Sequence, residues 1–372
     1  MHFEETTFLT PEESRLQLAF VVYPFIPKHC ARYLRNVEVS FMMVRMGVIG
    51  VGSFGEKRAA AAAQVSKGQL IGVADLSLER ARDVAKKLGV TAFTVEELLA
   101  HPHIDVVCIS VPNKFHAPLA IQALGYGKHV MCEKPLARSA AEAEAIVVKA
   151  EKTGRMVKTG SNHRYFQSVA RAYKIAMSGA IGELVSFNGR IGNNGERVRN
   201  TWFWDKEMSG GGTLLDNGCH LLDIARWMFG DFVEGTGLIS TVYWKDCQVE
   251  DTATGVFVTK AGKMATIASS WRQLSGYFHF EVNGAHGYIA VDGRFNTHGG
   301  DNLYWQCTKD GGEIHSINFG QVKPNSYVDE LEEFLSDIET GRQPKPDGRD
   351  GLAVLRMVEA IYGSNGKRVT LG

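Results

Sequence analysis

An aspartate and a histidine stand four residues apart in the stretch Ser209-Gly-Gly-Gly-Thr-Leu-Leu-Asp216-Asn-Gly-Cys-His220-Leu-Leu-Asp223. If the stretch is helical from Thr213, both side chains lie on one face, within reach of each other. A histidine that a carboxylate orients, beside a glycine-rich turn with room for a ligand, is suited to acid–base catalysis. Two alternatives are a core histidine with Asp216 as a helix cap, and a metal site of Asp216, His220 and Asp223. Because no further His or Cys has metal-binding spacing, we predict no metal.

A glycine-rich turn predicts a nucleotide cofactor. Gly50, Gly52 and Gly55 have the G-x-G-x-x-G spacing of dinucleotide-binding turns, directly after a short apolar strand. The first glycine allows a tight turn, the second lets a pyrophosphate approach the backbone, and the third allows close helix–strand contact. The helix that follows offers its N-terminal N–H groups to phosphate. The next strand ends in Asp75, where a carboxylate binds the ribose hydroxyls of NAD and repels the 2′-phosphate of NADP. We therefore predict NAD, with NADP less favoured, although Arg80 lies near enough to offset that charge.

A lysine after a buried strand is the other catalytic candidate. Lys134 follows the apolar run 128–132 and stands between Glu133 and Pro135. A buried lysine is costly unless it faces a polar cleft. If its pKa falls, it can accept a hydroxyl proton while hydride leaves for nicotinamide. The alternative is a surface lysine whose stem lies along the protein.

Strands and helices alternate between residues 46 and 160, and the strands are apolar almost throughout. This pattern predicts a parallel sheet covered by helices on both faces, with ligands at the carboxyl ends of its strands. Asn113, His116, Glu133 and Lys134 are expected at that edge. His116 either contacts the nicotinamide or is simply the N-terminal residue of a helix. Arg164 has either a structural role or a role in substrate binding.

The second half of the chain is rich in β-branched and aromatic residues. Two helical stretches, 166–177 and 212–229, are expected among strands at 184–191, 235–244, 252–259, 264–271, 277–282 and 288–291, and two helices, 327–340 and 349–364, close the chain. Consecutive strands suggest a large antiparallel sheet with one face on helices and one free. A free face with Tyr243, Trp271, Phe278 and Phe280 would suit a subunit interface.

Composition restricts the class of protein. The 372 residues are enough for two domains, and Lys+Arg and Asp+Glu both total 41, so no basic excess predicts nucleic acid or an anionic membrane. Six scattered cysteines without a CxxC pair favour a reduced, cytoplasmic protein. The apolar run 16–26 follows glutamates and is too short for a membrane span. Residues 1–44 are expected to be an extension outside the fold, or else an arm that packs on a partner subunit.

These motifs together resemble the glucose-fructose oxidoreductase, inositol dehydrogenase and rhizopine-catabolism (Gfo/Idh/MocA) family. The motifs are Gly-Val-Ile-Gly-Val-Gly-Ser-Phe-Gly, Val-Ala-Asp75, Val-Pro-Asn113-Lys-Phe-His116, Cys-Glu133-Lys134-Pro135-Leu and Gly-Gly-Gly-Thr-Leu-Leu-Asp216-Asn-Gly-Cys-His220. The resemblance runs from about Met46 to Gly372. It implies an α/β protein, with a Rossmann domain (45–160) that has a doubly wound parallel sheet. A C-terminal α/β domain (161–372) with a large open antiparallel sheet would bind substrate and form a homodimer or homotetramer.

The resemblance also implies the site residues. Lys134, Asp216 and His220 would form the catalytic trio, with Asp216 orienting and charging His220, and a cis bond would precede Pro135. The cofactor would contact Gly50, Gly52, Ser53, Phe54, Gly55, Asp75, Ser110, Pro112, Asn113, His116, Glu133 and Lys134. The substrate would contact Lys134, Arg164, Asn217 and His220. The sequence departs from the family at His163, which interrupts a more usual Asn-Arg-Arg-type run.

The expected function is hydride transfer between NAD and a hydroxyl carbon of a small-molecule sugar, sugar acid or cyclitol. Fold alone does not fix function. Two rivals remain, a non-enzymatic sensor that binds dinucleotide, and an NAD-dependent glycosidase that oxidises its sugar transiently.

Overall fold

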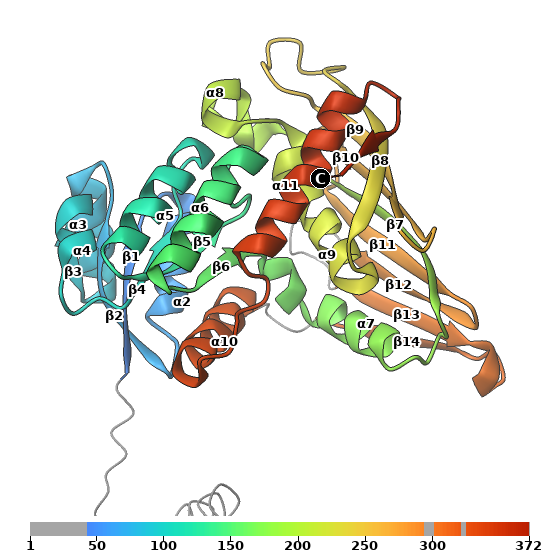
Figure 1. Cartoon of the computed structure of the whole chain (residues 1–372), viewed down its shortest axis with the longest axis horizontal. Coiled ribbons are helices and arrows are strands. Elements are labelled where there is room, and N and C mark those ends of the chain that lie inside the picture. The colour runs from blue at the N-terminus through green and yellow to red at the C-terminus, as the bar shows by residue number, and fades with distance from the viewer. Residues whose placement is uncertain (1–42, 294–300, 321–324, 372) are drawn as a thin grey trace, which may run out of the picture. The chain divides into compact units, whose positions relative to one another are not determined.

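The computed structural model describes residues 43–293, 301–320 and 325–371 (Figure 1). The predictions made for the N-terminal extension lie outside this part of the chain, except that Val44 already belongs to the first strand.

The first half forms the predicted parallel sheet. Its strands are β1 (Val44–Ile49), β2 (Gly68–Ala74), β3 (Thr91–Phe93), β4 (Val106–Ile109), β5 (His129–Glu133) and β6 (Val157–Gly160), in the order β3-β2-β1-β4-β5-β6. The helices are α2 (Ser53–Ala62), α3 (Leu78–Leu88), α4 (Val95–Ala100), α5 (His116–Gly125) and α6 (Ala140–Thr153). Every residue of β4 is buried, as expected of a strand that helices cover on both faces. The doubly wound Rossmann architecture is confirmed.

Local sequence sets the helix ends in this half. The Ser77 hydroxyl accepts the Arg80 N–H at the start of α3, and Gly89 ends that helix with a φ of +67°. A capping box of Thr94 and Glu97 starts α4. Because the strands of this sheet are all parallel, the residues that follow their carboxyl ends lie at one edge of the sheet.

The second half forms a larger, mixed sheet. Its strands are β7 (Leu184–Gly192), β8 (Phe232–Ser240), β9 (Thr252–Thr259), β10 (Met264–Ser270), β11 (Tyr277–Gly284), β12 (Gly287–Gly293), β13 (Asn302–Cys307), β14 (Ile314–Asn318) and β15 (Val369–Thr370). The order is β14-β13-β12-β11-β7-β10-β9-β8-β15. The expected antiparallel pattern holds except between β7 and β10, which run parallel. The long crossover after β7, through α8 (Lys206–Ser209) and α9 (Cys219–Phe229), makes that pairing possible.

Helices cover one face of this sheet. In Figure 1, α7 (Gln167–Met177), α9 and α11 (Gly348–Ser364) lie on the side of the sheet that faces the Rossmann strands. Trp271, Phe278 and Phe280 are buried on this covered face, so their placement on a free face was wrong. They share the inward alternation of Ile267 and Val282, while Tyr243, in the loop after β8, is half exposed.

The last helices join the two halves. On α10 (Ser326–Thr340), Leu331 and Phe334 pack into the core beneath β1 and β2 with Met46 and Leu70, and α11 packs against α6 and β6. Thus the Rossmann core is completed from the C-terminal segment. Among the described residues, no helix is both long and apolar enough to cross a membrane.

Candidate active site

The glycine turn has the geometry that its spacing predicts. Gly50 has a φ of +86°, and a Cβ there would stand 2.4 Å from the Ser110 carbonyl oxygen. A Cβ at Gly55 would lie 1.9 Å from the Gly50 oxygen, so only glycine allows this helix–strand approach. A Cβ at Gly52 would meet no heavy atom within 4 Å. The backbone of Gly52 is therefore open on the side where a pyrophosphate would approach, and these residues fit a dinucleotide.

Asp75 follows β2 and faces this turn. Its Oδ2 accepts the Val51 N–H at 2.9 Å, and its Oδ1 accepts the Ser77 N–H at 2.9 Å. The exposed Arg80 guanidinium donates to the same Oδ1 at 3.0 Å. The carboxylate is thus fixed beside the glycine turn, with a cation already against it.

The remaining cofactor candidates lie along the same edge. Ser53 and Phe54 begin α2, and Ser110 and Pro112 follow β4. The side chains of Asn113 and His116 have protein partners instead of facing a ligand.

Asn113 and His116 brace the loops at this edge. The buried Asn113 amide donates to the Ser209 carbonyl at 2.7 Å. The buried His116 ring lies with Nδ1 2.8 Å from the Pro135 oxygen and Nε2 2.9 Å from the Val111 oxygen. Since both ring nitrogens face backbone oxygens, His116 has none left for a nicotinamide. His116 connects the loops that follow β4 and β5, which favours the structural alternative given for it above.

Glu133 belongs to a buried ion-pair network. The Arg58 guanidinium donates to the Glu133 carboxylate and, at 2.9 Å, to Glu330 of α10, and it stacks over the Tyr327 ring. Burial raises the pKa of Glu330 to about 7, although Arg58 opposes the shift. The network fixes the end of β5, and therefore the backbone next to Lys134.

Lys134 pairs with Asp216. Its Nζ donates to the Asp216 carbonyl at 2.8 Å and to Oδ1 at 2.9 Å, while the indole N–H of Trp271 lies 3.4 Å from Oδ2. Burial lowers the pKa of Lys134, but the charge and hydrogen bond of Asp216, together with the nearby Cys219 and Glu133, outweigh burial, so the pKa lies above its ordinary value. The expectation of a lowered lysine pKa was wrong. Lys134 is held as an ammonium, a hydrogen-bond donor rather than a proton acceptor. The predicted cis bond before Pro135 is confirmed.

His220 does not interact with Asp216 as expected. Residues Leu214–Gly218 form a π-helical turn before α9, and the Asp216 carboxylate on that turn is engaged by Lys134 and Trp271. The His220 ring instead stacks on His163, with centroids 3.5 Å apart and planes 6° from parallel. Burial holds the pKa of His220 well below its usual range, and the nearby His163 and Lys134 lower it further. His220 is therefore neutral at pH 7.

Two predicted substrate contacts have structural partners. The buried Arg164 donates from Nε and Nη2 to the two oxygens of Asp223, at 2.7 and 2.6 Å. The buried Asn217 amide lies 3.4 Å from the Thr213 hydroxyl of its own turn. These partners follow from burial, because buried polar groups are usually hydrogen-bonded, and the substrate contacts of Arg164 and Asn217 stay predictions. In the described part of the chain, no three His, Cys, Asp or Glu side chains are placed to hold a metal ion.

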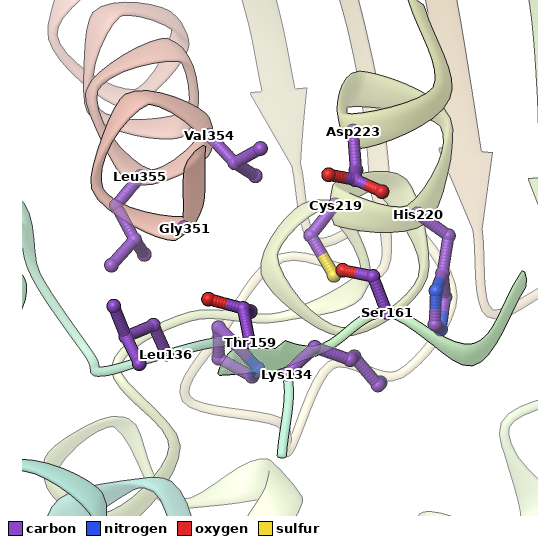
Figure 2. Close-up of a pocket in the computed structure, with 11 residues that line it drawn as sticks. Lys134, Leu136, Thr159, Ser161, Cys219, His220, Asp223, Gly351, Val354 and Leu355 are labelled. Carbon is purple, nitrogen blue, oxygen red and sulfur yellow. The ribbon is translucent and has the colours of Figure 1, made fainter. Parts of the chain in front are cut away.

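Lys134 and His220 share one cavity. Figure 2 shows both with Cys219 and Asp223, opposite Gly351, Val354 and Leu355 of α11. The cavity lies between the carboxyl ends of β5 and β6 and the first turn of α9.

Several residues shape the site in roles that the sequence did not predict. Trp271 contacts Asp216, His163 stacks on His220, and Arg58 holds Glu133. Strand alternation from Ile267 would have placed Trp271 in the core. The other partnerships join residues too far apart in sequence for any local pattern to reveal them.

Comparison with known families decides the classification. Residues 44–161 match the model of the Gfo/Idh/MocA oxidoreductase family, NAD-binding Rossmann fold, and residues 169–290 match the model of the Gfo/Idh/MocA C-terminal domain. The chain belongs to the Gfo/Idh/MocA family. It is therefore an oxidoreductase with an NAD-binding Rossmann domain, as its motifs predict.

Relatives of this Gfo/Idh/MocA protein span nearly its whole folded length. The D-xylose 1-dehydrogenase (NADP(+)) 2 of Haloferax volcanii is 30% identical, with 86% of this chain and 96% of the relative covered. The myo-inositol 2-dehydrogenase of Thermotoga maritima is 28% identical, with 84% and 93% covered. A levoglucosan dehydrogenase in complex with NADH and L-sorbose has the same fold, with a TM-score of 0.82 at 24% identity over 88% of this chain and 99% of that one.

Proposed function

We propose that this protein transfers hydride between NAD and a hydroxyl carbon of a sugar, sugar acid or cyclitol. The observation that carries the proposal is the Lys134 ammonium, held by Asp216 in the same cavity as the neutral His220. A cation and a neutral base on one cavity suit a hydroxyl that must lose its proton as it is oxidised. Relatives named as xylose and inositol dehydrogenases support this substrate class.

The two side chains have different roles in the oxidation. The Lys134 ammonium donates a hydrogen bond to the substrate oxygen and stabilises the negative charge that develops there. His220 takes the hydroxyl proton, because its low pKa leaves a nitrogen lone pair available at neutral pH. NAD, bound with its pyrophosphate at the glycine turn, would supply the hydride acceptor in its nicotinamide ring. In the reduction direction the same groups act in reverse.

Asp216 acts through Lys134 rather than through His220. The lysine Nζ donates one hydrogen bond to the Asp216 carboxylate and one to its carbonyl. These bonds fix the ammonium in place and help to keep it charged despite burial. The Trp271 indole steadies the other carboxylate oxygen.

An assay panel tests the proposed function. Purified protein is incubated with NAD and a panel of pentoses, hexoses, sugar acids and inositols, and NADH is followed at 340 nm. We expect NADH to accumulate with at least one hydroxyl substrate. Tight NADH binding without oxidation of any panel member would favour the sensor. Cleavage of a glycoside without net NADH would favour the NAD-dependent glycosidase.

NAD is the cofactor that we expect to be preferred. The Asp75 carboxylate would lie beside the ribose hydroxyls and repel a 2′-phosphate, a like-charge contact that costs on the order of a hundredfold in affinity. Fluorescence titration should show tighter binding of NADH than of NADPH, and Asp75→Ser should narrow or reverse the difference. Arg80→Gln is the matched control, because it removes the neighbouring cation and should weaken NADPH alone. Equal affinities for both cofactors in the wild type would contradict the prediction.

Replacing Asp216 should change how the rate depends on pH. Asp216→Asn removes the charge that raises the Lys134 pKa while burial, which lowers it, remains. The lysine then loses its proton at a lower pH, so the oxidation rate should fall earlier in the alkaline range than in the wild type. At pH 7 we expect kcat to fall by about tenfold to a hundredfold, near the lower end of effects for positioned acid–base groups. A kcat profile from pH 6 to 11 measures both, and an unchanged alkaline limb would show that Asp216 does not set the lysine charge.

We also propose a homodimer or homotetramer through the open face of the large sheet. That face carries apolar side chains, among them Leu238, Val256 and Met264, and no helix among the described residues lies over it in Figure 1. Light scattering should give a mass above one chain, and Val256→Glu with Met264→Glu should lower it. The control Lys152→Glu, on the exposed side of α6, should leave the mass unchanged. A monomeric wild type would refute the interface.

A cytoplasmic location completes the proposal. The five cysteines of the described residues are all free and buried, as expected in a reducing compartment.

A further inference from the structure

The orientation of His220 needs an explanation, because Asp216 does not supply it. A histidine that transfers protons is usually held by a hydrogen bond to its second ring nitrogen. In the described part of the chain, the buried His220 Nδ1 has no hydrogen-bond partner. Some other contact must therefore fix the plane of this ring.

The contact that the structure supplies is an aromatic stack. His163, in the short turn Asn162–Tyr165 after β6, lies parallel to His220 with ring centroids 3.5 Å apart. Phe166 packs on His163 with centroids 4.4 Å apart and planes inclined by 30°. The buried Phe278 of β11 meets His163 edge-on at 5.3 Å. His220 therefore rests on a ring that the core of the second domain holds.

We propose that His163 is a positioning residue, which fixes by ring stacking the orientation in which His220 transfers the substrate proton. The inference rests on the proposed function and goes beyond it, because it assigns a role to the residue at which the chain departs from its family's usual run. The turn that carries His163 connects the Rossmann sheet to the C-terminal segment, so the stack also ties the proton acceptor to the strand next to Lys134.

The stack also excludes water from His220. The titratable groups around the ring are His163, Lys134, Asp216, Cys219 and Asp223, of which Asp216 is bound to Lys134 and Asp223 to Arg164. Burial, His163 and the lysine charge keep His220 neutral, and burial likewise lowers the pKa of His163 to about 3. Opening one face of the ring to solvent would lessen the burial, and the pKa of His220 would rise toward its ordinary value.

Three variants of the full chain test the proposal. His163→Ala removes the stack, His163→Phe keeps a flat ring in its place, and Leu222→Ala makes a cavity on α9, in the core, as a control for lost packing. The measurements are kcat, its fall at low pH (the acid limb of the pH profile), NADH affinity and melting temperature. We expect His163→Ala to lower kcat by about a hundredfold, to move the acid limb to higher pH, and to change NADH affinity by less than about threefold.

The other two variants separate positioning from packing. His163→Phe should lose about tenfold at most and move the acid limb less than His163→Ala does, because stacking and water exclusion survive and only the electrostatic effect of His163 on the pKa of His220 is lost. Leu222→Ala should lower the melting temperature without moving the limb. Equal losses in His163→Phe and His163→Ala, or a limb that stays in place in His163→Ala, would overturn the proposal.

A spectroscopic measurement tests the stacking role without depending on the proposed catalytic activity. ¹⁵N NMR of the histidine rings, assigned with His220→Gln, follows the titration of His220 without turnover. The proposal expects the His220 titration to move to higher pH in His163→Ala and to move less in His163→Phe. If the wild type oxidises nothing in the panel while this pattern is seen, the proposed function fails and the stacking role stands. If His220 titrates alike in all variants, the stacking role fails.

Discussion

Replacing Lys134 with methionine should lower kcat for the oxidation by about 10²- to 10⁴-fold while NADH affinity changes only a few-fold. Methionine keeps the length and apolar stem of the side chain but cannot stabilise the charge on the substrate oxygen, and one such donor typically contributes at this level. Steady-state kinetics gives kcat, and fluorescence titration gives the NADH affinity.

The variant needs a control for lost stability, because it leaves the Asp216 carboxylate without its ammonium partner. Lys128→Met provides one. Lys128 precedes the same strand at the opposite end of the sheet, and its buried Nζ donates to the His101 and Ile104 carbonyl groups. It should lower the melting temperature and leave kcat unchanged. A Lys134→Met enzyme at near wild-type rate would refute the assigned role.

Replacing His220 with glutamine should lower kcat about as much as Lys134→Met does, by roughly 10²- to 10⁴-fold. Glutamine can still form a hydrogen bond but cannot take up the proton. In the wild type the pKa of His220 lies below its usual range, so the oxidation rate should be constant near pH 7 and fall only in acid, as the ring becomes protonated. The variant should lose that acid limb.

Two further measurements sharpen the histidine prediction. His129→Gln is the matched control, since this ring stands at the start of β5 and accepts the Met156 N–H far from the cavity. His129→Gln should leave both kcat and the acid limb of its pH profile unchanged. The double variant Lys134→Met with His220→Gln should lose less than the product of the single losses, because groups that act as one unit cannot be lost twice. Strictly multiplicative losses would show independent roles.

Much of the fold follows from local patterns in the sequence. Apolar runs and regular spacing predicted the parallel sheet, and Ser77 and Gly89 marked the ends of α3, because caps and periodicity are properties of neighbouring residues. Phe278 and Phe280 were assigned to the wrong face. Their alternation was visible in the sequence, but which face the helices cover depends on tertiary packing.

The site was predictable in its residue types more than in its partnerships. Lys134 and His220 do share a cavity, yet Asp216 pairs with a lysine 82 positions away. The spacing of Asp216 and His220 is compatible with contact, but spacing cannot reveal that Lys134 and Trp271, distant in sequence, hold the carboxylate instead. His163 was noticed only as a departure from a family pattern, and its stacking depends on a contact between distant segments.

Direct observation of hydride transfer tests the central claim most directly. A hydroxyl substrate from the panel, deuterated at the carbon that reacts, is mixed with NAD and enzyme in a single turnover, and the cofactor is analysed by mass spectrometry. The account predicts that the wild type moves the deuterium to C4 of the nicotinamide, and that Lys134→Met, saturated with the same cofactor, does so at least about a hundredfold more slowly. Transfer at equal rates in both enzymes, or reduced cofactor without deuterium, would contradict it.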